Sequence, residues 1–215
     1  MIIKHLGIIP DGNRRWAREK GLPYGDAYIC FSNHICDIIR HLTSYPLDMV
    51  TFYVISKENL GREQSDLADV MDAVKAMLGS KILPLANELD VQIRCIGLDN
   101  VADADLVSIA RNVQSLTRQN SGMIVNFLIG YNPFDEINSV IQQYGTLSIE
   151  KLSIPLPVDL LIRTAGCPTR LSNFLPLQCG YALIETVEPK FLDLNCSAID
   201  DIFAKYSSHT PNYGK

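Results

Sequence analysis

A carboxylate, an amide and two guanidiniums follow a short apolar run near the start of the chain. The run is Leu6-Gly7-Ile8-Ile9-Pro10, and the residues after it are Asp11-Gly12-Asn13-Arg14-Arg15-Trp16. A helix that begins near Asn13 would direct its free N–H groups toward an anion, and Arg14 and Arg15 can add charge-assisted hydrogen bonds. Asp11 would repel a phosphate unless a cation joined the two. This conflict indicates Mg²⁺, which is usually held by one or two carboxylates together with substrate phosphates.

The alternative for this first cluster is a purely structural role. Asp11 would then cap the helix, and Arg14 and Arg15 would be solvated. The tight grouping with Trp16 favours the anion site over this alternative.

A second polar cluster follows the next apolar run, Phe52-Tyr53-Val54-Ile55. It reads Ser56-Lys57-Glu58-Asn59-Leu60-Gly61-Arg62. Ser56 taken alone is explained as the N-cap of a helix. If the first cluster binds an anion such as a diphosphate, Asn59 and Arg62 could face the same ligand.

A third cluster, residues 163–174, follows the apolar run at 158–162. Arg163, Arg170 and Ser172 lie there in a stretch rich in turn-forming residues and look like a second anion pocket. Surface ion pairing would explain either arginine, but not the two together with Ser172.

Apolar runs of strand length alternate with segments of helical period, which predicts an α/β domain with a largely parallel sheet. The expected strands are Leu6–Ile9, Met49–Ile55, Val91–Ile96, Ile124–Ile129, Val158–Ile162 and Tyr181–Glu185. One buried helix face is marked by Ile29, Ile35, Ile38, Ile39 and Leu42, and another by Leu67, Val70, Met71, Val74, Met77 and Leu78; further helices are expected over 103–119 and 134–144. In such sheets ligands bind beyond the carboxyl ends of the strands, where all three polar clusters fall.

Length and composition limit the remaining possibilities. The 215 residues are 47% hydrophobic, which suits one globular domain, expected over 1–206 with a C-terminal tail at 207–215. A net charge of −5 disfavours a nucleic-acid partner. The six cysteines are scattered, so we expect reduced thiols and a cytoplasmic protein. No segment predicts a signal peptide or a membrane span, while peripheral contact with a membrane stays open.

The three clusters resemble, in order, the motifs of the cis-prenyltransferases, the undecaprenyl diphosphate synthase superfamily. The matching segments are P-D-G-N-R-R-W-A at 10–17, Y-V-I-S-K-E-N-L-G-R at 53–62 and R-T-A-G-x₃-R-L-S-N-F-L at 163–175. The resemblance implies a homodimer of six-stranded, mostly parallel sheets flanked by helices. It also implies an apolar tunnel for the isoprenoid tail and prenyl diphosphates as substrates.

The resemblance further assigns roles by position. Asp11 would bind Mg²⁺ and assist departure of the allylic diphosphate, and Asn59 matches a position linked to proton removal. The allylic diphosphate would be held by Gly12, Asn13, Arg14, Arg15 and Arg62, and the second diphosphate by Arg163, Arg170 and Ser172. Trp16 and Ser56 complete the candidate substrate-binding residues.

Several positions depart from the family pattern. Tyr24-Gly25-Asp26-Ala27-Tyr28 stands where chain-elongating members carry a basic residue and a Gly-His pair. The second metal carboxylate of the family falls on Leu183, and Glu185 is the nearest acid. Pro10 and the tyrosine at the histidine position are similar to a subgroup that makes irregular, branched or cyclised skeletons of the lavandulyl type.

We therefore favour a short-chain prenyl diphosphate synthase that condenses an allylic diphosphate, such as dimethylallyl diphosphate, with a second C5–C10 prenyl diphosphate. Its product can be irregular. The second hypothesis is regular cis-elongation with isopentenyl diphosphate. The third, of another class, is a non-catalytic partner subunit, which the presence of Asp11 and Asn13 disfavours.

Overall fold

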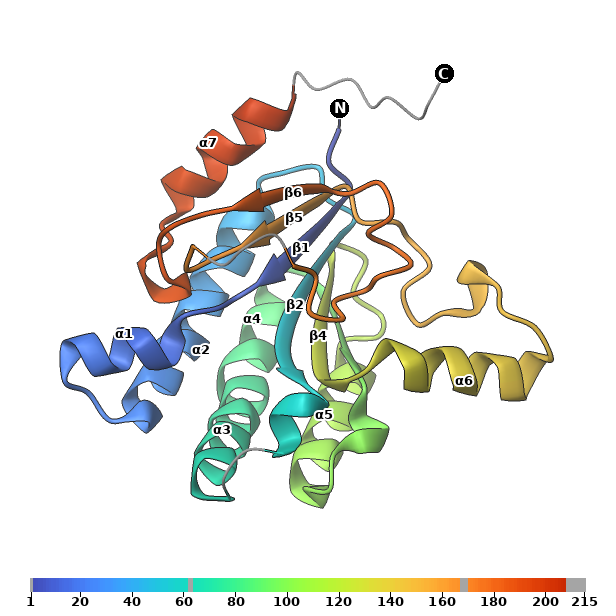
Figure 1. The fold of residues 1–215 in the computed structure, drawn as a ribbon, viewed down its shortest axis with the longest axis horizontal. Helices are drawn as coiled ribbons and strands as arrows, with labels where there is room; N and C mark the ends of the chain where they lie inside the picture. The colour runs from blue at the N-terminus through green and yellow to red at the C-terminus, as the bar shows by residue number, and fades with distance from the viewer. Residues whose placement is uncertain (1, 62–63, 167–169, 208–215) are drawn as a thin grey trace.

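The computed structural model describes residues 2–61, 64–166 and 170–207, without the side chains of 64–66. Its centre is a six-stranded sheet in the order β3-β4-β2-β1-β5-β6, in which every neighbouring pair is parallel (Figure 1). The strands are β1 (His5–Ile9), β2 (Met49–Ser56), β3 (Gln92–Ile96), β4 (Ile124–Tyr131), β5 (Leu160–Arg163) and β6 (Leu183–Thr186). All six strands expected from the sequence are confirmed, and the α/β fold class with them.

Seven α-helices lie in the described part of the chain. They are α1 (Asn13–Lys20), α2 (Tyr24–Leu42), α3 (Gln64–Ala76), α4 (Leu83–Glu88), α5 (Ala104–Leu116), α6 (Pro133–Tyr144) and α7 (Cys196–Ser207). Helices α2 to α5 lie on one side of the sheet, whereas α6 projects away from it (Figure 1). A turn of π-helix, Met77–Ile82, joins α3 to α4.

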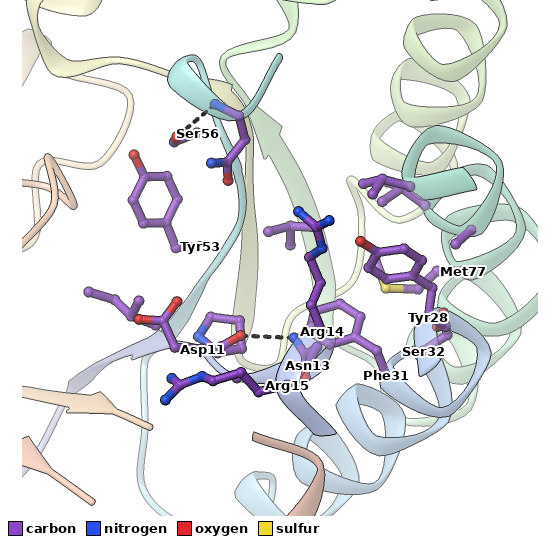
Figure 2. A pocket seen from close by; sticks show the side chains of 18 of the residues that line it. Asp11, Asn13, Arg14, Arg15, Tyr28, Phe31, Ser32, Tyr53, Ser56 and Met77 are labelled. Atoms are coloured by element: carbon purple, nitrogen blue, oxygen red, sulfur yellow. Dashed lines mark hydrogen bonds between the residues drawn. The ribbon is translucent and has the colours of Figure 1, made fainter. Parts of the chain in front are cut away.

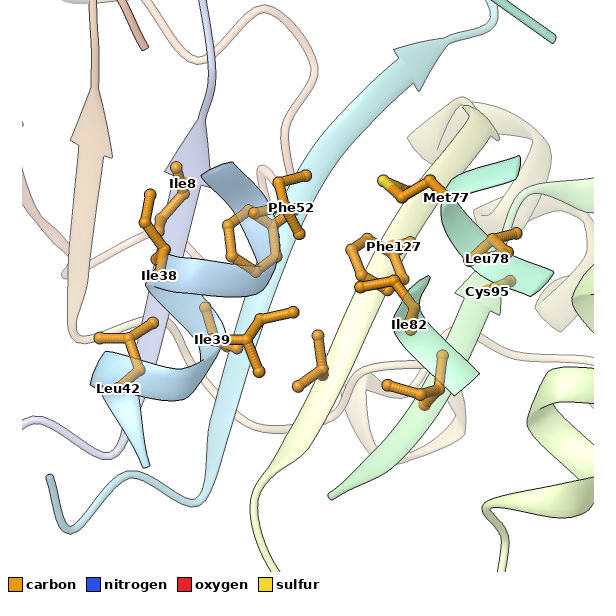
Figure 3. Packing of buried hydrophobic residues seen from close by; sticks show 14 of the residues in the cluster. Ile8, Ile38, Ile39, Leu42, Phe52, Met77, Leu78, Ile82, Cys95 and Phe127 are labelled. Atoms are coloured by element: carbon orange, nitrogen blue, oxygen red, sulfur yellow. The ribbon is translucent and has the colours of Figure 1, made fainter. Parts of the chain in front are cut away.

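The buried apolar residues form two clusters on opposite faces of the sheet. The larger cluster joins the strands to α2, α3, α5 and α7, with Ile8, Ile38, Phe52, Met77 and Phe127 at its centre (Figure 3). In the smaller cluster, strand residues pack against the connecting segments around 154–158 and 171–182. One face of the sheet is thus covered mainly by helices and the other by loops.

The helix faces expected from the sequence are present, with one correction. Ile35, Ile38, Ile39 and Leu42 are buried, but Ile29 is 56% exposed. Ile29 is six residues from Ile35, which in a helix of 3.6 residues per turn places it well away from the axis of the buried face. Helix α5 ends at Leu116, because Thr117 and the residues after it form a turn instead of a further helical turn.

Some expectations concern residues at the limits of the description. Arg62 and Cys167 lie outside the described residues, as does the expected tail except for Ser207, which ends α7. The described cysteines are Cys30, Cys36, Cys95, Cys179 and Cys196, and all five are free thiols. Among the described helices, none combines the length and the hydropathy that a bilayer span needs.

Candidate active site

A cavity of about 480 Å³ opens at the carboxyl ends of β1, β2 and β5. These strands are neighbours, because β1 pairs with β2 on one side and with β5 on the other. The charged and polar residues that the three clusters contribute to its lining are Asp11, Asn13, Arg14, Arg15, Ser56, Asn59, Arg163 and Ser172, with Gly12 between them. The structure therefore brings residues from all three sequence clusters to one cavity.

Gly12 lets the chain turn from β1 into α1 in very little space. It has φ = 98°, and a Cβ atom there would lie 2.8 Å from Cβ of Ala165 and 2.9 Å from Cβ of Lys190. Gly12 is also the N-cap of α1, without a side-chain capping bond. Asp11 is therefore not the helix cap, and the N–H groups of the first turn keep their capacity to bind an anion.

The carboxylate of Asp11 is held by Arg163. Its Oδ2 atom accepts hydrogen bonds from Nε of Arg163 at 2.9 Å and from Nη2 at 2.7 Å. The arginine side chain is only 7% exposed, and that of Asp11 is 36% exposed. No described residue donates a hydrogen bond to Oδ1 of Asp11. Arg163 is thus a buried ion-pair partner and not a surface one.

The same guanidinium also reaches the third cluster. Its Nη1 atom donates to Oγ of Ser172 at 2.9 Å and to the carbonyl oxygen of Arg170. These bonds use the remaining terminal nitrogen, so Arg163 joins the end of β1 to the loop after β5.

Two further arginines give the cavity a positive charge. The Arg14 guanidinium lies 4.7 Å from the ring centroid of Tyr24, and Nη2 of Arg15 donates to the carbonyl oxygen of Ala165 at 3.3 Å. Three guanidiniums, those of Arg14, Arg15 and Arg163, and one carboxylate, that of Asp11, are present among the described residues that line the cavity. This charge suits a ligand with several negative charges.

The second cluster contributes both a cap and a cavity wall. Oγ of Ser56 accepts a hydrogen bond from the backbone N–H of Asn59 at 3.2 Å, so the capping role expected for Ser56 is present. Both residues also line the cavity. Tyr53, which no sequence pattern marked as a site residue, lines the same wall. Burial raises the pKa of Tyr53 to about 12, so its hydroxyl is protonated at neutral pH.

The far side of the cavity is mostly apolar. It is formed by Tyr28, Phe31 and Ser32 of α2, by Val70, Ala73 and Val74 of α3, and by Met77 of the π-helical turn. Figure 2 shows Phe31, Tyr28 and Met77 on one side of the cavity, Asp11 and Arg15 on the other, and Arg14 between them. The cavity therefore has a cationic end and an apolar end.

Two candidate residues lie outside the lining of this cavity. Trp16 donates from Nε1 to Oδ1 of Asp193 at 2.9 Å, a contact that fixes α1 against the segment after β6. The Arg170 side chain is exposed, and only its carbonyl oxygen contacts Arg163. Arg62 falls outside the described residues, so its place in the site stays a prediction.

The side chains that line the cavity suit a metal ion that is coordinated mainly by a bound phosphate ligand and only in part by the protein. No group of three or more His, Cys, Asp or Glu side chains capable of holding a metal occurs among the described residues. Glu185, the nearest acid to the missing second carboxylate, accepts hydrogen bonds from Nζ of Lys205 at 2.7 and 3.0 Å and from the hydroxyl of Tyr206. Among the described residues that line the cavity, Asp11 is the only one with a carboxylate, and one carboxylate together with substrate phosphates is an ordinary way to hold Mg²⁺.

Comparison with known sequences agrees with the motifs. The family model described as "Putative undecaprenyl diphosphate synthase" matches residues 9–214. The chain is 30% identical over 232 residues to an isoprenyl transferase of Lactococcus lactis, with 100% of this chain and 94% of that protein covered. It is 28% identical to a ditrans,polycis-undecaprenyl-diphosphate synthase of Coxiella burnetii, specific for (2E,6E)-farnesyl diphosphate, with coverages of 100% and 97%.

Solved structures share the fold over the whole chain. Lavandulyl diphosphate synthase from Lavandula x intermedia, in complex with dimethylallyl diphosphate, has a TM-score of 0.89 at 23% identity, covering 99% of this chain and 98% of that one. A probable undecaprenyl diphosphate synthase from Campylobacter jejuni has a TM-score of 0.82 at 25% identity, with full coverage of both chains. The resemblance predicted from three short motifs is thereby confirmed.

Proposed function

Because the chain belongs to the undecaprenyl diphosphate synthase family and is a prenyltransferase, we propose that it condenses an allylic diphosphate with a second prenyl diphosphate and releases diphosphate. One observation carries the proposal. Asp11, the N-terminus of α1, Arg15 and Arg163 lie at one end of a cavity whose other end is apolar, and Arg14 lies between the two ends. Such a cavity matches a ligand with a charged head and a hydrocarbon tail.

The first diphosphate would lie at the start of α1. The backbone N–H groups that follow Gly12, together with Arg14 and Arg15, would bind its oxygens and stabilise the charge that builds on the leaving group. Asn13 would assist with the second N–H of its amide, since Nδ2 already donates one hydrogen bond, to the carbonyl oxygen of Pro10 at 2.9 Å. Its Oδ1 atom is buried without a hydrogen-bond partner among the described residues.

Asp11 would hold Mg²⁺, which would add positive charge at the departing diphosphate. The protein groups around it do the remaining work. Arg163 orients the carboxylate through two hydrogen bonds to Oδ2. Phe31, Val74 and Met77 keep water from the electron-poor carbon that forms when the diphosphate leaves.

The second diphosphate would be bound by Arg163 and Ser172, which line the cavity, and by the exposed side chain of Arg170 on the same loop after β5. Asn59, on the turn after β2, also lines the cavity, and we propose that it acts near the proton that the second substrate loses. A neutral amide is a weak base, so we assign Asn59 the task of orienting the proton acceptor.

The size of the product separates two forms of the proposal. A cavity of about 480 Å³ lies in the lower part of the range for small-molecule sites, which favours a short product. Regular cis-elongation is the second candidate, supported by the relatives named as undecaprenyl-type synthases. That candidate needs an extended tunnel to take a longer tail.

Product analysis distinguishes the two. The pure protein is incubated with Mg²⁺ and dimethylallyl diphosphate, alone and with isopentenyl or geranyl diphosphate, and the dephosphorylated products are identified by gas chromatography with mass spectrometry. A branched ten-carbon product from dimethylallyl diphosphate alone supports the irregular short-chain form. A linear cis product that requires isopentenyl diphosphate supports regular elongation, and no turnover with any pair contradicts both.

We also propose that the protein is a homodimer in the cytoplasm. Helix α6 and the segment after it carry exposed apolar side chains, namely Phe134, Ile141, Tyr144, Leu147 and Ile149. Such a patch on a projecting helix is typical of an interface between subunits. Light scattering of the intact protein tests this, because Ile141→Asp should shift the mass from dimer to monomer.

The proposed location in the cytoplasm is supported by the free thiols of the described cysteines, which suit a reducing compartment.

A further inference from the structure

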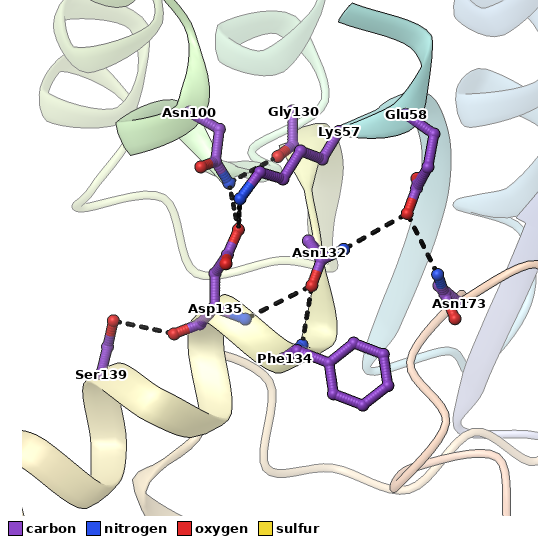
Figure 4. Close-up of polar contacts among 9 residues, drawn as sticks. All are labelled: Lys57, Glu58, Asn100, Gly130, Asn132, Phe134, Asp135, Ser139 and Asn173. Atoms are coloured by element: carbon purple, nitrogen blue, oxygen red, sulfur yellow. Dashed lines mark hydrogen bonds and ion pairs between the residues drawn. The ribbon is translucent and has the colours of Figure 1, made fainter. Parts of the chain in front are cut away.

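Three segments from different strands meet at the carboxylate of Glu58, just outside the cavity. Glu58 itself follows β2, Asn132 follows β4, and Asn173 belongs to the loop after β5 (Figure 4). Oε1 of Glu58 accepts hydrogen bonds from Nδ2 of Asn132 at 3.3 Å and from Nδ2 of Asn173 at 3.1 Å. One carboxylate oxygen thus links the three segments.

The orientation of Asn132 is fixed by a second set of bonds. Its Oδ1 atom caps α6, accepting from the backbone N–H groups of Phe134 at 2.9 Å and Asp135 at 3.3 Å. The amide nitrogen must then face Glu58 and donate to it. Hydrogen bonds from its own backbone N–H, from Ser56 and from the two amides hold the pKa of Glu58 below its usual range, so the acceptor is charged at neutral pH.

The loop after β5 has a backbone that needs external support. Ala165, Ser172, Asn173 and Leu175 have φ values of 69°, 49°, 66° and 37°, although none of them is glycine. Left-handed backbone at such residues costs free energy and persists only where surrounding contacts enforce it. Ser172 is held on one side by Arg163, and its neighbour Asn173 is held on the other by Glu58.

We propose that Glu58 is a positioning residue for the pocket of the second diphosphate. By holding Asn173, it keeps the adjacent Ser172 hydroxyl at the place where Arg163 and a phosphate oxygen can both reach it. Glu58 does not itself touch the substrate. The identity of the ligand in this pocket rests on the proposed function, whereas the link between Glu58 and the loop does not.

Exchanging the amide and the carboxylate between Asn173 and Glu58 tests the link between Glu58 and the loop after β5. Asn173→Asp keeps the shape of the side chain and a residue type that tolerates positive φ. It also places two carboxylates next to each other, so that repulsion replaces the hydrogen bond. Adding Glu58→Gln removes the repulsion, because its side chain is neutral, nearly the same shape as glutamate, and able both to donate and to accept a hydrogen bond. The matched control is Glu150→Gln, at an exposed glutamate on a different segment, the short 3₁₀ helix Ile149–Lys151.

Kinetics give the first readout. We expect Asn173→Asp to raise KM for the second diphosphate about tenfold, with KM for the allylic diphosphate within about twofold, and the double variant to return within about threefold of the parent protein. Glu150→Gln should change neither constant. An unchanged KM in Asn173→Asp, or a double variant no better than the single one, overturns the proposal.

Amide hydrogen exchange of the ligand-free protein gives a second readout that needs no substrate. Residues 170–176 should exchange faster in Asn173→Asp and return toward the parent rate in the double variant, while α5 stays unchanged. If the parent protein turned over no substrate pair, the proposed function would fail and this measurement would still decide the role of Glu58. Equal exchange in all variants would contradict that role.

Discussion

Asp11 and Arg163 hold each other through two hydrogen bonds to a single oxygen, Oδ2 of the aspartate, at 2.9 and 2.7 Å. The pair joins the first sequence cluster to the third and places the proposed metal ligand beside the proposed site of the second diphosphate. It also satisfies a guanidinium that is nearly buried, since its side chain is 7% exposed. The charge of Arg163 is therefore compensated before any ligand binds.

The first prediction concerns the stability of this pair. Asp11→Asn should lower the free energy of unfolding by about 1–3 kcal/mol, because it leaves a buried guanidinium without a counter-charge. Arg163→Met combined with Asp11→Asn should cost less than the sum of the two single changes, with a coupling of about 1 kcal/mol or more. Urea unfolding at pH 7 measures all three variants. Additive losses would show that the pair contributes no coupling.

A second prediction concerns the turn into α1. Gly12→Ala should destabilise the protein by about 1–3 kcal/mol, since the new Cβ meets Ala165 and Lys190 at a backbone angle that L side chains rarely adopt. Gly145→Ala is the control for the angle alone, because its φ is 76° and no atom lies within 4 Å of the added Cβ. Gly25→Ala, inside α2 and also without close neighbours, should be neutral or slightly stabilising. An equal loss at Gly12 and Gly145 would mean that the close contacts carry no cost.

A third prediction concerns acid stability. His5 is fully buried, its Nδ1 lies 3.0 Å from the carbonyl oxygen of Leu156, and its Nε2 lies 2.8 Å from Oγ1 of Thr51. Burial lowers the pKa of His5, and burial likewise lowers the pKa of His34. The unfolded chain therefore binds more protons than the folded one below about pH 6.5, so stability should fall as the pH drops from there toward the folded-state pKa values.

The slope of this loss can be assigned by mutation. Each histidine contributes up to about 1.4 kcal/mol per pH unit, so His5→Asn should reduce the slope by up to that amount even if the variant is less stable at pH 7. Chemical unfolding between pH 5 and 7.5, at about half-unit steps, gives the slope. A slope unchanged in His5→Asn would show that His5 titrates normally in the folded protein.

A fourth prediction concerns the apolar end of the cavity. Val74 is 4% exposed and lines the wall formed by α3, so Val74→Phe should fill part of the space for the hydrocarbon tail and shift the products toward shorter ones. Val140→Phe is the control, because Val140 is 5% exposed on α6 and does not line the cavity. Overpacking should destabilise both variants by about 1–3 kcal/mol, but only Val74→Phe should change the product ratio. An unchanged ratio would place the tail elsewhere.

The sequence predicted the sheet and the convergence of its polar clusters well, because both follow from simple patterns. Buried parallel strands read as short apolar runs, and the polar residues after them must meet at one edge of the sheet. Gly12 was likewise recognisable as part of a strand-to-helix turn. The residues of the second and third clusters, Asn59 and Ser172 among them, reach the cavity for the same reason.

Other parts of the site depend on geometry that no local pattern encodes. The pairing of β2 with β4 shifts register between Tyr53 and Ile55 and again before Ser56, and such bulges redirect side chains at the end of a strand. Tyr53 lies before these shifts, inside an apolar run, so the sequence marks it only as a buried strand residue. The bonds from Arg163 to Asp11 and from Asn173 to Glu58 join residues more than 100 positions apart, and only the folded chain brings them together.

Trp16 and Arg170 show that a sequence motif can also include residues that lie outside the cavity lining. Both are sequence neighbours of residues that line the cavity. Trp16, however, donates its indole N–H to Asp193, and Arg170 contacts Arg163 only through its carbonyl oxygen. Neighbours on a helix or in a tight loop point in different directions, so adjacency in sequence does not predict a shared cavity.

The most direct test of the account is the release of diphosphate from dimethylallyl diphosphate, with its preferred second substrate, by the parent protein and by Asp11→Asn. The rate is followed by a phosphate-coupled assay with Mg²⁺ and with the metal removed by chelation; Asp201→Asn, at an exposed residue of α7, is the control. We expect Mg²⁺-dependent turnover in the parent protein and the control, and a rate at least about 100-fold lower in Asp11→Asn. Undiminished turnover in Asp11→Asn, or without metal, would contradict the central role of this carboxylate.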